Sequence, residues 1–361
     1  MNGGLLEWAR YYADRDALVV KLSTPLRVVT TLPHQPGRTG YIVFKKVPES
    51  FRCDSIASFY RRVRRSMGLR EAVVFLTAAE VDRPLHEVID EPETHIIATV
   101  GLKPPACPGG TAGAPRPGTI NIAVATSAGL SRAGAIDLLR VVAEAKAAAA
   151  AEALLPCLHR ATGTATDAIA VLHTPGATDF SGFYTRLGGL VGRSLYFALV
   201  DAAVARRGPD SLLRALTGMS MEGLLELFRR VYMQSPIPGV PVEEALGRAG
   251  RMLERMMRDP NVAALLIAAR ELDLHGSAGA IPGLSRSGYK GDSKAIVADE
   301  LLAAALAEYL AGFKGLLATI WVEKLKSMGL ADAGLPMFMD DMVSAVVGSL
   351  VSRLHDEVRE G

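Results

Sequence analysis

The sequence predicts an α/β (or α+β) domain followed by an all-α helical domain. The first half alternates runs rich in Val and Ile with helical patterns, whereas β-branched alternation disappears after about residue 208 and helical periodicity takes over. A chain of 361 residues is also long for a single hydrophobic core. We therefore expect two domains, at residues 1–207 and 208–361.

The elements of the first domain follow from local patterns. Runs of β-branched and apolar residues predict strands at 17–22, 26–31, 41–44, 72–76, 95–100, 120–125 and 168–173. Amphipathic spacing predicts helices at 55–67, 133–155 and 187–205. A long loop rich in Pro and Gly, residues 103–117, separates two of the strands, and loops of that length are more often functional than idle.

The second domain is predicted to be helical throughout. The helices are expected at 211–216, 221–232, 242–257, 261–274, 295–309, 313–328 and 337–358. Pro260 and Pro336 stand where a helix starts, and Gly276 and Gly329 where one ends. Loops are expected at 235–241 and 276–292.

Composition excludes several classes of protein. Hydrophobic residues make up 49% and charged residues 22%, which is the balance of a globular protein. A net charge of +2 provides no basic face for nucleic acid. No uncharged apolar run reaches about 18 residues, so no transmembrane segment is expected. The nearest approach, residues 301–322, is interrupted by Glu308 and Lys314.

The cysteines and the chain start indicate a cytoplasmic protein. Cys53, Cys107 and Cys157 are odd in number and far apart, so neither a disulfide framework nor a zinc site is expected. The first residues, followed by charges from Glu7 onward, do not read as a signal peptide.

Three polar clusters interrupt the core segments of the first domain: 117–122, 144–146 and 161–167. Burying a hydroxyl without a hydrogen-bond partner costs about 1–3 kcal/mol of folding free energy. A segment that only packs in the core would therefore not be expected to contain so many hydroxyl groups. The clusters therefore predict a site that holds a polar substrate and transfers protons.

Together with residues 75–81, 99–102 and 187–192, these clusters resemble the adenosylcobinamide amidohydrolase family over most of residues 15–205. The resemblance implies hydrolysis of the amide that joins the corrin side chain to aminopropanol, which releases adenosylcobyric acid. No cofactor is evident for this domain. The sequence departs from the family pattern at 32–40, where relatives tend to carry Asn-Gly-Gly, and at Lys103-Pro104, where they carry an Asn.

Amide hydrolysis needs an activated nucleophile, an oxyanion stabiliser and an acid for the leaving amine. Glu144 is expected to activate water or a hydroxyl, and Lys146, on a different helix face, to pair with Asp167. Thr162 and Thr164 are expected on a turn that meets the substrate.

Two further residues complete the candidate catalytic set. Asn121 would donate to the oxyanion, and Thr119, made accessible by Gly118, is a candidate nucleophile ranked below an activated water. Alternatively, residues 162–167 form a satisfied turn capped by Asp167, and Glu144 and Lys146 are solvated helix charges.

The second domain contains acidic residues at three places in the sequence, and together they predict a Mg²⁺ site: Asp299-Glu300, Glu323, and Asp340-Asp341. Mg²⁺ takes oxygen ligands, and carboxylates from separate helices commonly converge in a bundle. Arg286, Lys290 and Lys294 are expected to bind phosphate in the loop before a helix start, and Lys326, which follows Glu323, is the fourth expected phosphate-binding residue. Asp340 and Asp341 alternatively complement a helix dipole.

The acidic pattern is similar to that of the phosphatidylglycerophosphatase A superfamily, which reads Asp-Glu, Asp-x-x-Lys and Asp-Asp. Glu323 replaces the middle Asp. Within the superfamily the segment is closer to archaeal α-ribazole-5′-phosphate phosphatases. The two resemblances imply a bifunctional cobamide-salvage protein with small-molecule substrates. The alternatives are a lipid phosphatase in the second half, or a non-catalytic corrinoid-binding module in the first.

Overall fold

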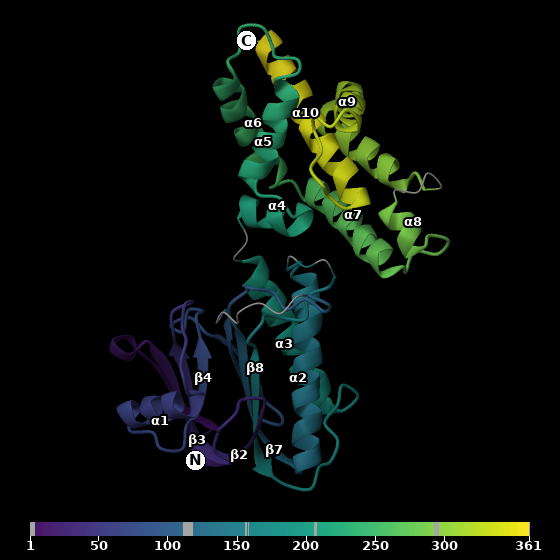
Figure 1. The fold of residues 1–361 in the computed structure, drawn as a ribbon. Coiled ribbons are helices and arrows are strands. Elements are labelled where there is room, and N and C mark those ends of the chain that lie inside the picture. The colour runs from purple at the N-terminus through teal and green to yellow at the C-terminus, as the bar shows by residue number, and fades with distance from the viewer. Residues whose placement is uncertain are drawn as a thin grey trace. The chain divides into compact units, whose positions relative to one another are not determined.

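The computed structural model of the chain describes residues 4–110, 118–155, 157, 159–205, 208–291 and 296–360. The chain divides into two compact units, Met1–Arg206 and Arg207–Gly361, which are described separately below. The first unit combines a sheet with helices, and the second is made of helices (Figure 1), so the predicted fold class is confirmed.

The first unit is built on an eight-stranded mixed sheet. Its path runs β4-β3-β2-β8-β7-β6-β5, and β1 pairs with β2. Two neighbouring pairs, β3–β4 and β7–β8, are parallel. The strands are β1 (Leu6–Tyr12), β2 (Ala17–Thr30), β3 (Arg38–Lys46), β4 (Val73–Thr77), β5 (Leu85–Ile89), β6 (Thr94–Val100), β7 (Ile120–Leu130) and β8 (Ala168–Pro175).

The predicted strands are present, with two differences. The runs at 17–22 and 26–31 form one strand, β2, with a register shift between Lys21 and Leu26. The strands β1 and β5 were not predicted, because they lie at the margins of the sheet and bury too few side chains to leave an apolar pattern.

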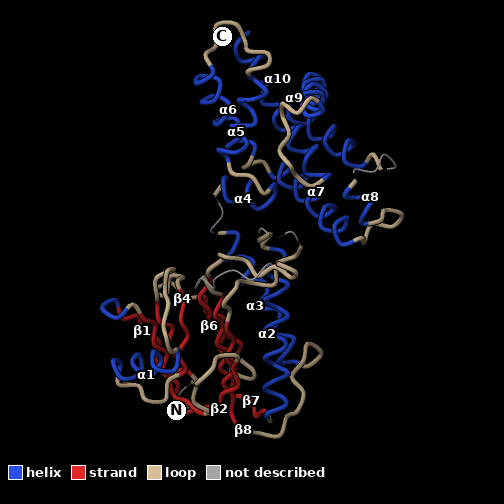
Figure 2. The backbone as a smooth tube through the Cα atoms, viewed as in Figure 1, coloured by secondary structure: helices blue, strands red, loops and turns tan. Residues whose placement is uncertain are grey.

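Three α-helices cover the outer face of this sheet: α1 (Ile56–Met67), α2 (Arg132–Glu152) and α3 (Arg186–Val204). Each begins at a predicted position because Ser55, Ser131 or Thr185 accepts a hydrogen bond from the backbone N–H three residues later. The helix α1 packs on β3 and β4, while α2 and α3 pack on β6, β7 and β8 (Figure 2).

The sheet curls so that its two halves share an inner core. Side chains from β2, β3 and β4 meet those from β6, β7 and β8 in one buried cluster. At one end, Asn121 Nδ2 on β7 donates to the Leu76 carbonyl of β4 at 2.8 Å, and Thr119 Oγ1 donates to Thr77 Oγ1 at 3.0 Å. This closure brings the polar end of β7 to the mouth of the curled sheet.

The second unit consists of α4 to α10. Their bounds are α4 (Pro209–Thr217), α5 (Met221–Tyr232), α6 (Val242–Met256), α7 (Pro260–Ala278), α8 (Arg286–Lys290), α9 (Ala298–Ser327) and α10 (Met337–Glu360). The predicted break near residue 310 is a kink in α9, where Ala311 and Gly312 leave the helical conformation. Gly348 lets α10 approach α9 closely, because a Cβ there would lie 2.7 Å from the Thr319 nitrogen.

The prediction that Gly276 ends a helix is wrong. The helix α7 continues to Ala278, and Gly279, with a φ of 71°, takes the left-handed position after it. Gly276 instead accommodates the ring of Tyr289, since a Cβ at Gly276 would lie 2.4 Å from Tyr289 Cδ2. That tyrosine belongs to α8, a short helix inside the segment expected to be a loop.

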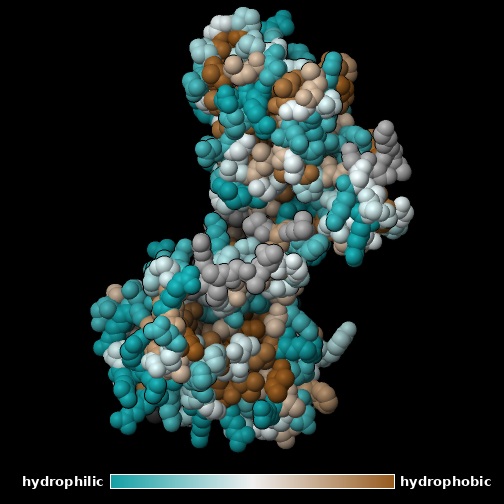
Figure 3. Space-filling model, in the orientation of Figure 1, coloured by the Kyte–Doolittle hydropathy of each residue, from teal (hydrophilic) through white to brown (hydrophobic). Residues whose placement is uncertain are grey.

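Two helices, α3 and α9, have the length and apolar composition needed to cross a membrane. These criteria are weak, because core helices of soluble proteins also meet them. The helix α9 exposes several large apolar side chains, among them Phe313 at 70% and Ile320 at 60%. On the face drawn in Figure 3, apolar side chains also gather in the middle of the first unit. The expected absence of a transmembrane segment therefore stays a prediction.

The expectation that the cysteines form no disulfide is wrong, because Cys107 and Cys157 are bonded to each other. They are 50 residues apart in sequence, but the loop after β6 folds back beside the segment that follows α2, which brings their Cα atoms to 5.6 Å. Cys53 is a free, exposed thiol. The cytoplasmic location inferred from scattered cysteines stays a prediction.

Candidate functional sites

A cavity of about 990 Å³ opens at the mouth of the curled sheet in the first unit. Its wall combines the end of β4, the start of β7, the turn before β8 and the segment that leads into α1. Polar and apolar side chains line it together, including Leu32, Asp54, Phe59, Thr119, Asn121 and Thr166. Two of the predicted catalytic residues, Thr119 and Asn121, thus lie in its wall.

Asn121 presents an unsatisfied acceptor there. The residue is buried, its Nδ2 group donates to Leu76, and its Oδ1 has no hydrogen-bond partner among the described residues. A buried acceptor without a partner costs free energy, and such atoms in native proteins commonly have a functional partner. Like Thr119, Asn121 is 1% exposed, so this acceptor lies just behind the surface of the cavity, whereas the sequence predicted a donor to the oxyanion.

Thr119 is less accessible than predicted. It is 1% exposed, and its hydroxyl donates to Thr77. Another hydroxyl of similar acidity cannot act as a base, so this contact does not activate Thr119 as a nucleophile. Gly118 serves a different purpose from the one predicted: a Cβ at this position would lie 1.6 Å from the Lys103 carbonyl oxygen.

The predicted pair of Lys146 and Asp167 is present, and it is largely buried. Asp167 Oδ1 accepts from the Ile120 nitrogen at 2.8 Å and from the Thr164 hydroxyl, while Oδ2 accepts from the Thr164 nitrogen at 2.9 Å and from Lys146. Asp167 therefore caps the turn at 162–166, which is the alternative to a catalytic role for these residues. With its acceptor sites engaged, Asp167 positions the start of β7 and the turn before β8.

The turn is held from its other side by the loop after β6. The Ala106 nitrogen donates to the Gly163 carbonyl at 2.8 Å, and the Thr162 nitrogen donates to the Ala106 carbonyl at 3.0 Å. Cys107 follows immediately, so the disulfide lies next to this pairing. The remainder of the predicted functional loop, residues 111–117, lies outside the described residues.

Glu144 lies apart from this network. It is exposed on α2, and its carboxylate pairs with Arg140 at 2.8 Å. As predicted, it faces a different direction from Lys146. Thr162 is exposed on the turn, whereas Thr164 is buried against Asp167. Five of the predicted catalytic residues are not among the described residues that line the cavity: Glu144, Lys146, Thr162, Thr164 and Asp167.

Sequence reasoning missed the segment that leads into α1. Residues 51–56 line the cavity, and Asp54 is the one carboxylate among its described lining residues. The segment has no conspicuous motif, and only the predicted helix start at Ser55 marked it.

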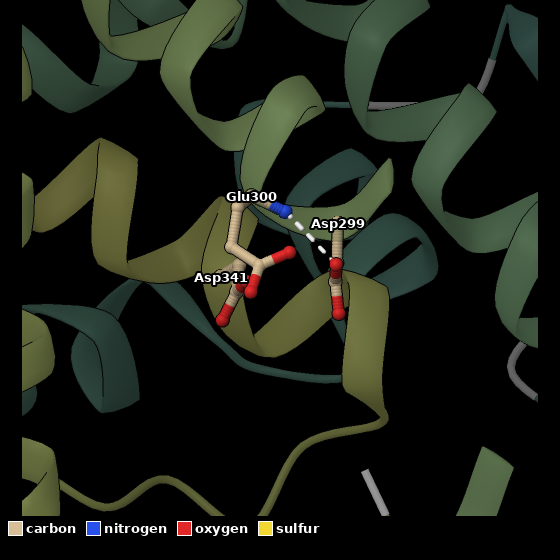
Figure 4. Close-up of side chains that lie close together, drawn as sticks. All are labelled: Asp299, Glu300 and Asp341. Carbon is tan, nitrogen blue, oxygen red and sulfur yellow. Dashed lines mark hydrogen bonds between the residues drawn. The ribbon is translucent and has the colours of Figure 1, made fainter. Parts of the chain in front are cut away.

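In the second unit, Asp299 and Glu300 from the start of α9 converge with Asp341 of α10 (Figure 4). One oxygen from each carboxylate lies within 4.8 Å of the others. Asp299 is buried, Asp341 is partly buried and Glu300 is exposed. Three converging hard oxygen donors are a ligand set that suits Mg²⁺.

Lys326 holds the other two predicted carboxylates. Its Nζ lies 2.7 Å from Glu323 and 2.6 Å from Asp340, and 3.5 Å from Asp341. Burial alone lowers the pKa of Lys326, but the hydrogen bonds to Asp340 and Glu323 outweigh it and raise the pKa above its usual value. Glu323 and Asp340 therefore neutralise a lysine at the edge of the carboxylate cluster.

Two carboxylates of the cluster, those of Asp299 and Asp341, have a raised pKa. Burial, followed by the neighbouring Glu300, raises the pKa of Asp299 to about 7. Burial, followed by the charge of Glu323, raises the pKa of Asp341 to about 6. Burial and adjacent like charges destabilise the ionised forms, and a divalent cation would relieve that cost.

Asp273 is a structural carboxylate that the sequence did not reveal. Its Oδ1 accepts from Tyr289 at 2.8 Å and from the Phe338 nitrogen at 3.0 Å, and its Oδ2 accepts from the Met339 nitrogen at 3.0 Å. It thereby satisfies the first N–H groups of α10, the helix that carries Asp341. A single Asp between two leucines in α7 gave no signal of this role.

The predicted phosphate-binding residues are dispersed. Arg286 and Lys290 are exposed on α8, and Arg286 Nε donates to the Ala278 carbonyl at 2.9 Å. Lys294 lies outside the described residues. Of the four, Lys326 alone is shown beside the acidic cluster.

The first unit thus has the features of a hydrolase site for a polar substrate: a roomy cavity, an unsatisfied amide oxygen and a carboxylate. Comparison with known families specifies the class further. The model of the adenosylcobinamide amidohydrolase family matches residues 4–210, more than half of the chain, and the protein belongs to this family.

Similarity to individual proteins adds little. No curated protein matches the chain significantly. The low temperature requirement C protein of Listeria monocytogenes is 20% identical, over 42% of this chain and 94% of that chain, with a TM-score of 0.34. Protein ypjQ of Bacillus subtilis is 16% identical, over 42% and 93%, with a TM-score of 0.34. A Bacillus stearothermophilus protein of unknown function is 21% identical, over 41% and 92%, at 0.33. With TM-scores of 0.33–0.34, these three structures establish neither the fold nor the function of this protein.

Proposed function

We propose that the cavity at the mouth of the curled sheet hydrolyses the aminopropanol amide of adenosylcobinamide. The unpartnered Oδ1 of Asn121 in the cavity wall carries this proposal. Asn121 is 1% exposed, so the cavity wall would have to open slightly for Oδ1 to accept a hydrogen bond from the scissile amide N–H or from the attacking water. Family membership supports the substrate and the reaction.

Water is the proposed nucleophile, because no base contacts the Thr119 hydroxyl. Asp54 would take one proton as the water oxygen bonds to the amide carbon. The C–N bond then breaks, and Asp54 would return that proton to the leaving amine. Asp167 and Lys146 would position Ile120 and the 162–166 turn without touching the substrate.

Substitution of the two cavity residues tests this assignment. Asn121→Ala and Asp54→Asn should each lower kcat/KM for aminopropanol release by about 10²-fold or more. Glu144→Gln is the matched control, because Glu144 lies on the exposed face of α2, and it should retain activity. Full activity of both cavity variants, or its loss in the control, would contradict the assignment. Binding of adenosylcobinamide without aminopropanol release by the wild-type protein would instead favour the corrinoid-binding alternative.

For the second unit we propose a Mg²⁺-dependent phosphatase that acts on α-ribazole-5′-phosphate, which would make the protein bifunctional. The convergence of Asp299, Glu300 and Asp341 supports a cation site. Bound Mg²⁺ would offset the charge that develops on the phosphoryl oxygens. Lys326 would compensate the charges of Glu323 and Asp340, so that the phosphate approaches a less negative surface.

Asp341→Asn should abolish Mg²⁺-dependent phosphate release and leave aminopropanol release intact. Asp356→Asn, on an exposed part of α10, is the matched control. The exposed apolar residues of α9 favour one rival, a lipid phosphatase. That rival predicts activity on detergent-dispersed phosphatidylglycerophosphate and partition into membranes, and activity on α-ribazole-5′-phosphate alone would exclude it.

A further inference from the structure

A second cavity of the first unit, about 430 Å³, lies between β2, the following loop and the start of α2. Four of its lining side chains are arginine or histidine: Arg27, His34, Arg132 and His173. None of its described lining residues is Asp or Glu. The cavity is therefore suited to an anion.

Arg27 and His173 are neighbours on one face of the sheet. They are directly paired across β2 and β8, and the next pair on that face, Val29 with Val171, packs toward α2. Paired residues of antiparallel strands have Cβ atoms about 4.5–5.5 Å apart. Arg27 and His173 thus extend from neighbouring positions in the wall of this cavity, which Arg132 at the start of α2 also lines.

His173 presents one ring nitrogen without a partner. The residue is 2% exposed, and its Nδ1 bonds to the Thr174 carbonyl oxygen at 2.9 Å, which requires a proton on Nδ1. Its Nε2 makes no hydrogen bond to any residue in the described part of the chain. With the proton on Nδ1, Nε2 is an acceptor, and in the wall of the cavity it can take a hydrogen bond from a ligand hydroxyl.

The two arginines also lack partners. Neither Arg27 nor Arg132 forms an ion pair or side-chain hydrogen bond with a described residue. By contrast, Arg140, two turns further along α2, bridges Asp137 and Glu144. Arg132 is also the first residue of α2, where the free N–H groups and the helix dipole add positive potential.

We propose that this cavity binds a phosphoryl group, whose oxyanions are held by Arg27 and Arg132 and whose P–OH donates to Nε2 of His173. The site is additional to the proposed amide-cleaving site, because Asn121 faces the inner core of the curled sheet whereas His173 faces α2. Leu32 lines both cavities. The phosphoryl group could therefore belong to a corrinoid whose aminopropanol is phosphorylated, or to free phosphate.

Calorimetric titration of the full-length protein with inorganic phosphate, in chelator and without divalent cations, tests the proposal. Arg27→Gln and Arg132→Gln should each weaken phosphate binding about tenfold or more, because each removes a charge-assisted contact. Arg140→Gln, on the same helix, should bind like the wild type. Equal affinity in all four proteins, or no binding by the wild type up to 10 mM (roughly the weakest affinity of interest), would overturn the proposal.

Steady-state kinetics separates the two sources of the phosphoryl group. If the substrate carries it, Arg132→Gln should raise KM about tenfold for adenosylcobinamide phosphorylated on its aminopropanol, and leave KM for adenosylcobinamide unchanged. If free phosphate is the ligand, both KM values should be unchanged although titration shows weaker binding. Because the titration needs no turnover, a failure of the amidohydrolase proposal would not be confused with a failure of this one.

Discussion

Lys146 of α2 and Asp167, which precedes β8, form a largely buried ion pair beneath the turn at 162–166. They are 21 residues apart in the chain, and the pair fixes the turn against the start of β7. Asp167 has hydrogen-bond donors on both of its oxygens, so its charge is compensated from several sides. The pair thus supports the cavity wall without forming part of it.

Removing one partner of this pair should be costly. Asp167→Ala or Lys146→Met should lower the free energy of unfolding by about 3–5 kcal/mol, because the remaining charge stays buried without its partner. Arg140→Gln, which breaks the pairs of the exposed Arg140 with Asp137 and Glu144 on the same helix, should cost about 0–1 kcal/mol per pair. Urea denaturation followed by circular dichroism measures the difference. Equal costs for the buried and exposed pairs would mean that the buried pair is not structurally important.

Gly163 should not tolerate a side chain. Its φ is 142°, and a Cβ there would lie 2.1 Å from Asp167 Oδ2 and 2.5 Å from Lys146 Nζ. Gly163→Ala should therefore disrupt the pair, lower the melting temperature and reduce aminopropanol release. Gly37→Ala is the control, because a Cβ at that position meets nothing within 4 Å. A Gly163→Ala protein as stable as the control would show that the turn can move away.

Asp273 should matter for the stability of the second unit. Asp273→Ala leaves the Phe338 and Met339 nitrogens and the Tyr289 hydroxyl without their acceptor, at a cost of about 1–3 kcal/mol or more. Asp332→Ala removes an exposed carboxylate that accepts from a single nitrogen, that of Gly334, and should cost less. Thermal unfolding of the two variants compares them, and a reversed order would contradict the capping role.

Mg²⁺ should stabilise the protein more at pH 8 than at pH 5. Burial raises the pKa of Asp299 to about 7 and that of Asp341 to about 6, so the metal-free fold binds protons more tightly than the unfolded chain does. These groups therefore make the metal-free protein less stable as pH rises from about 4 to about 7. Mg²⁺ binds the ionised carboxylates and offsets this loss above pH 7.

Differential scanning fluorimetry at both pH values, with and without Mg²⁺, measures the effect. Asp299→Asn should lose most of the pH-dependent gain, whereas Asp356→Asn should keep it. A gain that is independent of pH, or unchanged in Asp299→Asn, would place the cation elsewhere.

The disulfide should contribute measurably to stability. Closing a loop of 50 residues corresponds to about 4 kcal/mol of chain entropy in the unfolded state. Cys107→Ser should therefore lower the melting temperature and remove its sensitivity to reductant. Cys53→Ser should leave both unchanged, because Cys53 is an exposed free thiol. Insensitivity of the wild-type protein to reductant would show that the bond is absent in solution.

The sequence predicted most elements, because buried strands and amphipathic helices leave periodic patterns. It missed β1 and β5, which bury too few side chains to leave an apolar pattern. It named Asn121 and the carboxylates of the second unit as candidates, and these stay predictions. It could not show that Lys326 pairs with Glu323 and Asp340. Nor could it place Asp54 in the same cavity wall as Asn121, since that depends on how the sheet curls.

The link between Asn121 and the Leu76 carbonyl has a consequence for how activity is lost. The cavity wall exists only while β4 and β7 are joined, and these strands lie far apart along the sheet order. If the proposed site is correct, catalysis would therefore depend on a long-range contact between strands of the curled sheet. In a denaturant titration, aminopropanol release and the sheet signal in circular dichroism should fall together, so that turnover itself reports the integrity of the first unit.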